Sequence, residues 1–303
     1  MIEFKSMALS RREQYNEYLM ADGERGCEYS FTNLYLWGRQ KAAFLEGRLA
    51  FFSHFYGRSV YPFPIGPGEL KPVLDAIFHD AEARGIPCRL TSLTKEDCLA
   101  LQELYPGRFR FRQDRDSFDY VYDINDLADL AGRKLQRKRN HVNRFFKDHP
   151  QAQLVPLTAE NLPAAREMVR LWFLSRIENA PQGTYLLEQV AMGRAFDHYE
   201  ELALEGGLLM EGEEVLAVTM GSRLSANTFD IHFEKARDDI DGAYAAVNRE
   251  FARYLRQRYP ELEFLNREDD LGLEGLRKAK LSYCPHHMVE KYWAYLAEEE
   301  HEI

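Results

Sequence analysis

The sequence predicts an α/β protein built from two domains in tandem. Its 303 residues are too many for one average domain and suit two domains of about 150 residues each. In both halves, segments with helical spacing alternate with short apolar segments typical of strands. A basic segment near the middle separates the halves. We therefore predict an N-terminal domain over residues 1–131, a basic linking helix over 132–150 and a C-terminal domain over 151–303.

Periodicity and turn residues place the elements of the first half. Strands are expected at 41–45 and 49–55, joined by a hairpin turn at Gly47. A helix is expected at 69–84, where apolar residues recur with helical spacing and Gly85 follows as a C-cap. The other elements predicted for this half are helices at 11–20 and 95–104 and strands at 88–92, 108–113 and 118–123.

The second half repeats this alternation. The predicted helices are 162–175, 185–204, 243–258 and 273–280, and the predicted strands are 208–210, 215–224, 228–234, 263–266 and 288–295. Helices, an antiparallel meander, a helix, a strand, a helix and a closing strand follow the order of the N-acetyltransferase-like fold. The predicted fold class is therefore α/β with α+β mixed sheets, as two tandem N-acetyltransferase-like domains joined by a basic helix.

Composition limits the function classes and the compartment. The net charge of −10 argues against general nucleic-acid binding, so no DNA partner is expected. The four cysteines lack metal-ligand spacing and are too sparse for a disulfide framework, which suits free thiols in a reducing compartment. The first residues have no signal-peptide core, and no apolar run could span a membrane. A cytoplasmic protein without a transmembrane segment is expected.

The histidines give no metal prediction. His286 and His287 are adjacent and would point to opposite sides of a strand, so a shared metal ion is not expected. His232 lies on an apolar strand and has the setting of a buried core histidine. The motifs of serine hydrolases, zinc proteases and P-loop enzymes are missing from the sequence.

The basic segment 132–147 holds seven cations and no carboxylate. As a helix it would carry Leu135, Val142 and Phe145/Phe146 on one face, which would hold it on the protein and turn the cations outward. Such a surface could follow the phosphates of a tRNA acceptor arm or bind an anionic lipid headgroup. Alternatively, it is a solvated linking helix. The candidate tRNA- or anion-binding residues are Arg133, Lys134, Arg137, Lys138, Arg139 and Arg144.

An acidic loop follows the strand 228–234. In acyl-CoA-using members of this fold, the loop at this place supplies backbone N–H groups to a pyrophosphate. Here it contains Asp238, Asp239 and Asp241, and like charges would repel a pyrophosphate. An ammonium group suits the loop better, such as the α-amine of an aminoacyl ester. Alternatively, these aspartates cap the next helix, whose N-terminus favours anions.

A third candidate region, 266–283, mixes carboxylates, cations and glycines after a strand. Glycines let a backbone approach a ligand closely, and loops at strand ends often carry sites. Arg277 and Lys280 lie three residues apart on one helix face and could bind a phosphate or carboxylate, with Tyr283 as a proton donor. The alternative is an exposed ion-pair network with Arg267, Glu268 and Glu274.

Four of these segments, 119–122, 133–141, 242–248 and 266–283, together resemble the phosphatidylglycerol lysyltransferase C-terminal-domain family, and the resemblance extends from residue 31 onward. It implies two acetyltransferase-like domains joined by a basic helix. Characterised relatives use aminoacyl-tRNA to aminoacylate a lipid headgroup, and the Fem peptidoglycan aminoacyltransferases share the architecture. Lipid-modifying relatives also carry a large N-terminal membrane region that these 303 residues do not contain, which leaves the acceptor open.

The expected activity is aminoacyl transfer by direct attack of an acceptor hydroxyl or amine on an aminoacyl ester. The acceptor would be a lipid headgroup or another small molecule. The expected donor is aminoacyl-tRNA, which the basic helix would hold, and no cofactor is expected. The expected catalytic residues are Arg277, Lys280, Tyr283 and Glu234. The expected substrate-binding residues are Asp238, Asp239, Asp241, Gly242, Asn248, Asn266, Glu268 and Asp270.

Two other functions fit the same sequence. An acyl-CoA-dependent N-acyltransferase would use a coenzyme A thioester as donor. A non-catalytic module would use the basic helix to bind RNA or an anionic surface.

Overall fold

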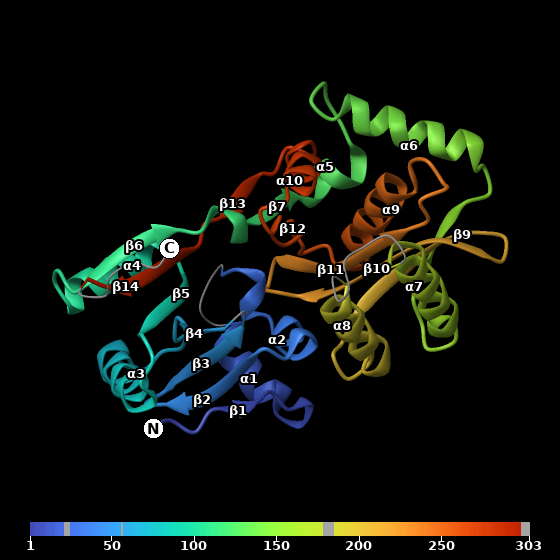
Figure 1. The fold of residues 1–303 in the computed structure, drawn as a ribbon. Coiled ribbons are helices and arrows are strands. Elements are labelled where there is room, and N and C mark those ends of the chain that lie inside the picture. Colours follow the sequence, from blue (N-terminus) through green and yellow to red (C-terminus); the bar gives the residue numbers. More distant parts are fainter. Residues whose placement is uncertain (21–24, 56, 178–184, 298–303) are drawn as a thin grey trace. The chain divides into compact units, whose positions relative to one another are not determined.

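The computed structural model describes residues 1–20, 25–55, 57–177 and 185–297. It contains two compact units. The first comprises Met1–Asp119, Asp269–Gly272 and Met288–Ile303, and the second comprises Tyr120–Glu268 and Leu273–His287. Each unit has a seven-stranded sheet with both parallel and antiparallel pairs (Figure 1). The predicted class of two tandem α/β units with mixed sheets is confirmed.

The sheet of the first unit contains a strand from the C-terminal part of the chain, next to one of its edge strands. Its order is β1 (Lys5–Ser6), β2 (Gln40–Leu45), β3 (Arg48–Phe55), β4 (Arg58–Pro62), β5 (Arg89–Leu93), β14 (Tyr292–Leu296) and β6 (Phe109–Gln113). Its α-helices are α1 (Arg12–Leu19), α2 (Phe31–Trp37), α3 (Leu70–Arg84) and α4 (Lys95–Leu104).

The core of the first unit lies between α3, α4 and the sheet. Val73 and Ile77 of α3 belong to one buried cluster with Leu90 of β5 and Ala294 of β14. Thr94 begins α4 with a capping box: its hydroxyl accepts from the Asp97 N–H, and the Asp97 carboxylate accepts from the Thr94 N–H. The capping and the helical spacing explain why this helix was predicted correctly.

The sheet of the second unit begins with two strands that the sequence places far apart. Its order is β13 (His287–Val289), β7 (Asp119–Asp123), β12 (Phe264–Asn266), β11 (Thr228–Ala236), β10 (Glu214–Arg223), β9 (Glu205–Glu211) and β8 (Gln153–Pro156). The helices of this unit are α5 (Ile124–Asp129), α6 (Gln136–Asp148), α7 (Leu162–Ile177), α8 (Leu186–Asp197), α9 (Ala243–Arg258) and α10 (Glu274–Leu281).

A β-bulge in β11 shapes the second sheet. Met220 of β10 pairs with Phe233, but the next residue, Gly221, pairs with Ile231. His232 is therefore an extra residue in β11, and the alternation of side chains between the two faces reverses there. Phe229 before the bulge packs edge to face on Phe251 of α9, and Ala236 after the bulge packs against α9 on the same side of the sheet.

The structure corrects the predicted division of the chain into residues 1–131, 132–150 and 151–303. The strand β7 pairs with β12 in the second sheet, and β14 pairs with β5 and β6 in the first sheet. The pairing therefore places β7 in the sheet of the second unit and β14 in the sheet of the first unit. The order of the sequence had predicted the reverse for both strands. The predicted strand 288–295 is two strands, β13 and β14, which belong to different sheets.

The basic helix α6 is part of the second unit and not a linker between units. Val142 and Phe145 are fully buried, as their place on one helix face predicted. Gly242, at the start of α9, has a φ of +86°, and a Cβ atom on it would lie 3.0 Å from the Cβ of Phe145. Glycine is therefore required where α6 and α9 come close. None of the helices in the described ranges is long and apolar enough to cross a membrane.

Candidate functional site

A buried ion pair in the second unit is the centre of the candidate site. Glu234 lies on β11 two residues after the bulge, and Arg267 follows β12 directly. The Arg267 Nη2 atom lies 2.9 Å from the Glu234 Oε1 atom, and both side chains are mostly buried. The second carboxylate oxygen, Oε2, accepts a hydrogen bond from the Asn248 Nδ2 atom at 3.3 Å. The bulge is what turns Glu234 toward α9, which carries Asn248.

Three buried polar atoms of this cluster have no hydrogen-bond partner among the described residues: Arg267 Nη1, Asn248 Oδ1 and Thr219 Oγ1. Asn248 is only 4% exposed, and Thr219, directly opposite Glu234 in the β10–β11 pair, is fully buried. Almost all buried polar groups in proteins have a partner, so these atoms suit a ligand or bound water. One is a donor, one an acceptor, and the threonine hydroxyl can be either.

Aromatic and cationic side chains line the same cluster. The Arg267 guanidinium lies 5.1 Å from the centre of the Tyr283 ring and 5.8 Å from that of Tyr122. The Lys138 ammonium lies 4.0 Å from the centre of the Tyr283 ring. Cations on aromatic faces are favourable. The Arg267 guanidinium suits an electron-rich group such as a carbonyl oxygen, and the Glu234 carboxylate suits a cation.

Burial and charge shift the pKa values of these groups. Burial and the nearby Arg267 lower the pKa of Lys138, although Glu234 opposes them. Burial raises the pKa of Tyr283 to about 12, so its hydroxyl stays protonated at neutral pH. Burial lowers the pKa of Arg267, but Glu234, Tyr122 and Tyr283 raise it by more, and the guanidinium stays charged.

The predicted catalytic residues divide into two sets. Glu234 and Tyr283 belong to the cluster. Lys280 does not extend its ammonium toward a ligand: Nζ donates to the backbone carbonyls of Arg267 and Glu268, and the Tyr122 hydroxyl donates to the Lys280 carbonyl. Lys280 thus holds the loop that carries Arg267. Arg277 lies on α10, a helix without a buried residue.

The predicted amine-binding aspartates are exposed, and each lies beside a different basic side chain. Asp238 pairs with Arg176 at 2.5 Å, and Asp239 pairs with Arg237 at 2.7 Å. Asp241 lies 3.5 Å from the His141 imidazole. These pairs do not form a single acidic pocket. The Glu234 carboxylate, by contrast, is mostly buried.

The remaining predicted substrate residues have structural contacts. Asn266 is buried, and its Oδ1 atom accepts from the Glu268 N–H at 2.7 Å. Asp270 belongs to the first unit, where it pairs with Arg115 at 3.2 Å and accepts from the Gly272 N–H. Gly242 is the N-cap of α9.

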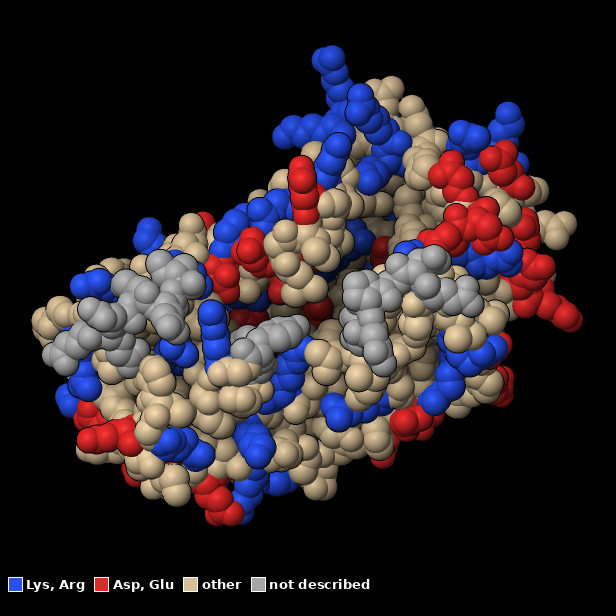
Figure 2. Space-filling view, viewed as in Figure 1, with Lys and Arg blue, Asp and Glu red and all other residues tan. Residues whose placement is uncertain are grey.

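The cations of the basic segment have different surroundings. Figure 2 shows Lys and Arg side chains gathered over the N-terminal part of α6. Arg133, Lys134 and Arg137 are exposed. Arg139 instead donates to the backbone carbonyls of Leu130 and Gly132, and Arg144 lies 3.7 Å from Asp148. Lys138 lies against Tyr283. Four of the six predicted residues have exposed side chains: Arg133, Lys134, Arg137 and Arg144.

Arg267 is the residue that sequence reasoning assigned only to an ion-pair network. Its pairing with Glu234 was not visible because 33 residues separate the two in sequence. Thr219 gave no signal, since a threonine in an apolar strand is common. Only the register of β10 with β11 identifies it as the neighbour of Glu234.

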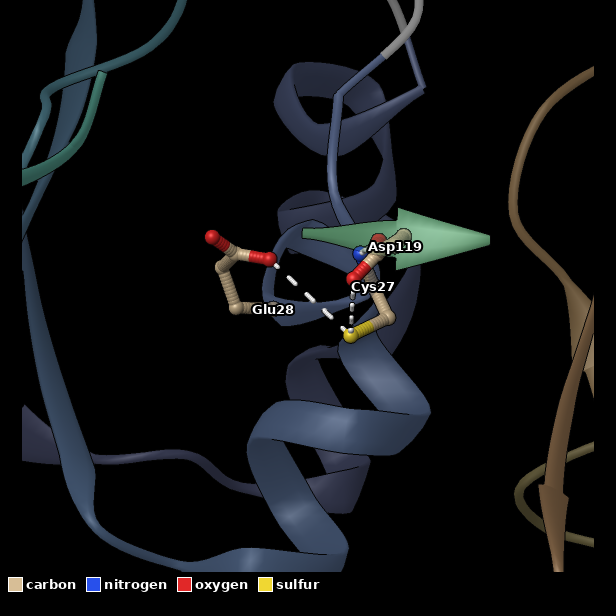
Figure 3. Close-up of side chains that lie close together, drawn as sticks. All are labelled: Cys27, Glu28 and Asp119. Atoms are coloured by element: carbon tan, nitrogen blue, oxygen red, sulfur yellow. Dashed lines mark hydrogen bonds between the residues drawn. The ribbon is translucent and has the colours of Figure 1, made fainter. Parts of the chain in front are cut away.

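A second group of polar side chains lies in the first unit. The Cys27 thiol donates to Asp119 Oδ1 at 3.5 Å and lies 3.9 Å from Glu28 Oε2 (Figure 3). The Lys291 ammonium lies 2.7 Å from Asp119 and 2.5 Å from Glu28. Burial lowers the pKa of Lys291, but Asp119, Cys27 and Glu28 raise it well above the usual value. The lysine thus provides the cation for these carboxylates, and this cluster is an internal ion pair.

Residues 23–295 match the family described as phosphatidylglycerol lysyltransferase, C-terminal. A conserved protein of unknown function from Bacteroides thetaiotaomicron is 36% identical, with a TM-score of 0.91, and the match covers 98% of this chain and 100% of that one.

Two more distant structures share the fold. L-PGS from Bacillus licheniformis has a TM-score of 0.71 at 15% identity, covering 99% of this chain and 95% of its own. FemX has a TM-score of 0.59 at 11% identity, covering 97% of each chain. An uncharacterized protein of Mycoplasmoides gallisepticum is 24% identical over 179 residues, and the chain spans 55% of its length. The family match and the Bacteroides relative establish that this chain belongs to the phosphatidylglycerol lysyltransferase C-terminal family.

Proposed function

We propose that this protein is an aminoacyltransferase that takes its aminoacyl group from aminoacyl-tRNA and transfers it to a hydroxyl or amine. The observation that carries the proposal is two buried atoms at the Glu234–Arg267 ion pair that have no partner among the described residues. Arg267 Nη1 is a donor, and Asn248 Oδ1 is an acceptor. An aminoacyl ester offers the complementary groups, an ammonium and a carbonyl oxygen, on adjacent carbon atoms. The family and the fold shared with FemX support a transferase.

The ammonium of the donor would lie between Glu234 and Asn248. Asn248 Oδ1 is a buried acceptor without a partner, and Glu234 supplies a carboxylate that is already oriented by Arg267 and Asn248. Thr219 Oγ1, opposite Glu234, can accept the third N–H of the ammonium. A charged amine buried without such partners would be strongly disfavoured, so these contacts would select an aminoacyl group over a simple acyl group.

The ester carbonyl would lie at Arg267. Its Nη1 atom is a buried donor without a partner, so it can bind the oxygen on which negative charge develops. The acceptor's oxygen or nitrogen forms a bond to the carbonyl carbon, and the ester bond to the tRNA ribose breaks. Lys138, whose pKa is lowered, is suited to take the acceptor's proton. Tyr283 is suited to give a proton to the leaving ribose hydroxyl.

The tRNA would bind along the exposed cations just before α6 and in its first turn. Arg133, Lys134 and Arg137 are exposed, and Figure 2 shows cationic side chains over this part of the helix. Phosphate contacts position a nucleic acid without reading its sequence. This arrangement suits a protein that uses the same acceptor end on different tRNAs. The proposed reaction needs two substrates and no cofactor.

The experiment is filter binding of charged tRNA at several salt concentrations, followed by a transfer assay with labelled aminoacyl-tRNA and candidate acceptors. The triple variant Arg133→Ala/Lys134→Ala/Arg137→Ala should bind more weakly, and the slope of log affinity against log salt should fall by about 2–3. A charge-matched control, Lys5→Ala/Lys41→Ala/Lys95→Ala, changes exposed cations of the first unit and should keep the wild-type slope. Absence of tRNA binding at low salt would rule out the proposal.

A further inference from the structure

A second polar cluster lies on the other face of β11 from Glu234. Phe229 and Glu234 both contact α9, through Phe251 and Asn248, although five residues separate them. The bulge at His232 explains this, because it reverses the alternation of side chains. Asp230 and His232 therefore point away from α9. There they meet Ser222 of β10 and Glu268, which follows β12.

Three possible ligand atoms converge in this cluster. His232 Nδ1 lies 3.2 Å from Glu268 Oε1 and 3.4 Å from Asp230 Oδ2, and all three atoms lie within 4.8 Å of one another. The side chains of His232 and Asp230 are 1% and 0% exposed, and that of Glu268 is 19% exposed. The other imidazole nitrogen, Nε2, lies 2.8 Å from the Ser222 hydroxyl.

From this geometry we propose that Asp230, His232 and Glu268 bind a divalent transition-metal ion, with Zn²⁺ as the best match. Imidazole and carboxylate ligands suit Zn²⁺, and bonds of 2.0–2.2 Å in a tetrahedron separate neighbouring ligand atoms by about 3.4 Å. The two measured separations are close to that value. They exceed the 2.7–2.9 Å typical of a hydrogen bond between a charged N–H and a carboxylate, which is roughly what a simple ion pair would adopt.

The charges of the cluster favour a dication. Two carboxylates and one imidazole lie together with little solvent, and this set of groups suits a divalent cation. With Nε2–H donating to the Ser222 hydroxyl, the Nδ1 lone pair faces the two carboxylates. Metal-bound histidines are commonly oriented by such a second contact.

The ion would connect two strand ends next to the Arg267–Glu234 pair. Glu268 has a φ of +56°, an unfavourable value for a residue with a side chain, and its N–H donates a hydrogen bond to Asn266 Oδ1. A bond from Glu268 to an ion on β11 would stabilise this turn. Because Arg267 precedes Glu268 directly, the ion would also fix the backbone that carries the Arg267 guanidinium. The proposed aminoacyl site does not itself contain the ion.

The test uses the full chain, stripped with a chelator and then titrated with Zn²⁺ by calorimetry. We expect one equivalent to bind with micromolar or tighter affinity and the melting temperature to rise. Co²⁺ in the same site should give the intense visible absorption of a tetrahedral complex. Glu268→Gln keeps the size of the side chain and should weaken binding at least tenfold, and Ser222→Ala should weaken it less.

The control removes the adjacent histidines. The Nδ1 atoms of His286 and His287 lie 2.9 Å apart, contrary to the prediction that they point apart, because only His287 belongs to β13. His286→Gln/His287→Gln should retain one equivalent of Zn²⁺. Absence of Zn²⁺ binding in the folded wild-type chain would overturn the proposal. So would binding that survives Glu268→Gln but is lost in the double-histidine variant.

Discussion

Arg267 and Arg277 are ten residues apart and have the same chemistry, yet only one lies in the candidate site. Arg267 is mostly buried, pairs with Glu234 and retains one guanidinium nitrogen without a partner. Arg277 lies on α10, which has no buried residue. A donor acts on developing charge most strongly where water is excluded, so burial distinguishes the two. The proposed function therefore depends on Arg267.

Arg267→Lys tests this distinction. Lysine keeps the positive charge but cannot pair with Glu234 and donate to a carbonyl through a second nitrogen. We expect the rate of aminoacyl transfer to fall by about 10²–10³, the range measured when one oxyanion donor is removed. Binding of tRNA should remain unchanged. Arg277→Lys is the matched control and should retain the wild-type rate; equal losses in both variants would contradict the assignment.

Lys138 gives a prediction for the dependence of stability on pH. Burial and Arg267 lower its pKa in the folded protein, so the unfolded chain binds this proton more readily. The contribution of Lys138 to stability is therefore least favourable below the folded pKa and improves as the pH rises toward 10.5, the ordinary lysine value. Lys138→Met should be more stable than the wild type near pH 7, and this difference should shrink by pH 9.5.

Urea unfolding at both pH values measures the effect of Lys138→Met. Lys134→Met changes an exposed lysine of the same segment and should show no such dependence. A difference that stays constant or grows with pH would contradict the predicted sign.

At the scale of elements, β11 and α9 together determine what the site contains. The bulge at His232 divides β11 into a part that directs Asp230 to one face and a part that directs Glu234 to the other. One strand thus serves two polar clusters. In the first unit, Lys291 precedes β14 and pairs with Asp119, the first residue of β7, and with Glu28. This ion pair connects three segments that are distant in sequence.

Lys291→Met should destabilise the protein strongly. The variant leaves the buried Asp119 carboxylate without its cation, and breaking a buried pair in this way costs about 3–5 kcal/mol. Chemical denaturation should detect the loss as a lower midpoint. Lys278→Met, at an exposed position of α10, should change the midpoint little. A small effect of Lys291→Met would show that Asp119 takes up a proton or water at low cost.

Much of the element pattern followed from the sequence, but much of the site did not. Helical spacing identified α3 and α9 and the buried face of α6, because these depend on residues within a few positions. Glu234, Asn248 and Tyr283 were singled out from their segments. Their grouping with Arg267 and Thr219 depends on which strands pair, and the extra residue in β11 can be recognised only from that pairing. The sequence did not show that Asp238 lies beside Arg176 or Asp241 beside His141, because these partners come from distant segments.

At the scale of the whole molecule, the two units exchange strands. The strand β7 follows the first unit in sequence but pairs in the second sheet, and β14 follows the second unit but pairs in the first. Neither unit is therefore a continuous piece of chain. β6 lies at the edge of its sheet, and its neighbour in the sheet order is β14.

Residues 1–119 alone should not fold cooperatively, because β5 and β6 lack the strand that joins them. Fusing residues 288–297 to this fragment through a flexible Gly/Ser linker should restore a cooperative transition. Circular dichroism and thermal unfolding measure both outcomes. The same fusion with Ala294→Asp, which places a charge at a fully buried position, should fail and serves as the control. Cooperative folding of residues 1–119 by themselves would contradict the prediction.

The position of β14 has a consequence for synthesis in the cell. β6 ends at Gln113 and its partner begins at Tyr292, so 179 residues separate them. At 5–20 residues per second, the ribosome needs roughly 9–36 s to make that stretch. Throughout that interval the facing edges of β5 and β6 have no strand between them and offer unpaired N–H and C=O groups to other nascent chains. β14 completes the first sheet only after this interval, so protection of these edges by chaperones during translation should affect how much of the protein reaches its native state.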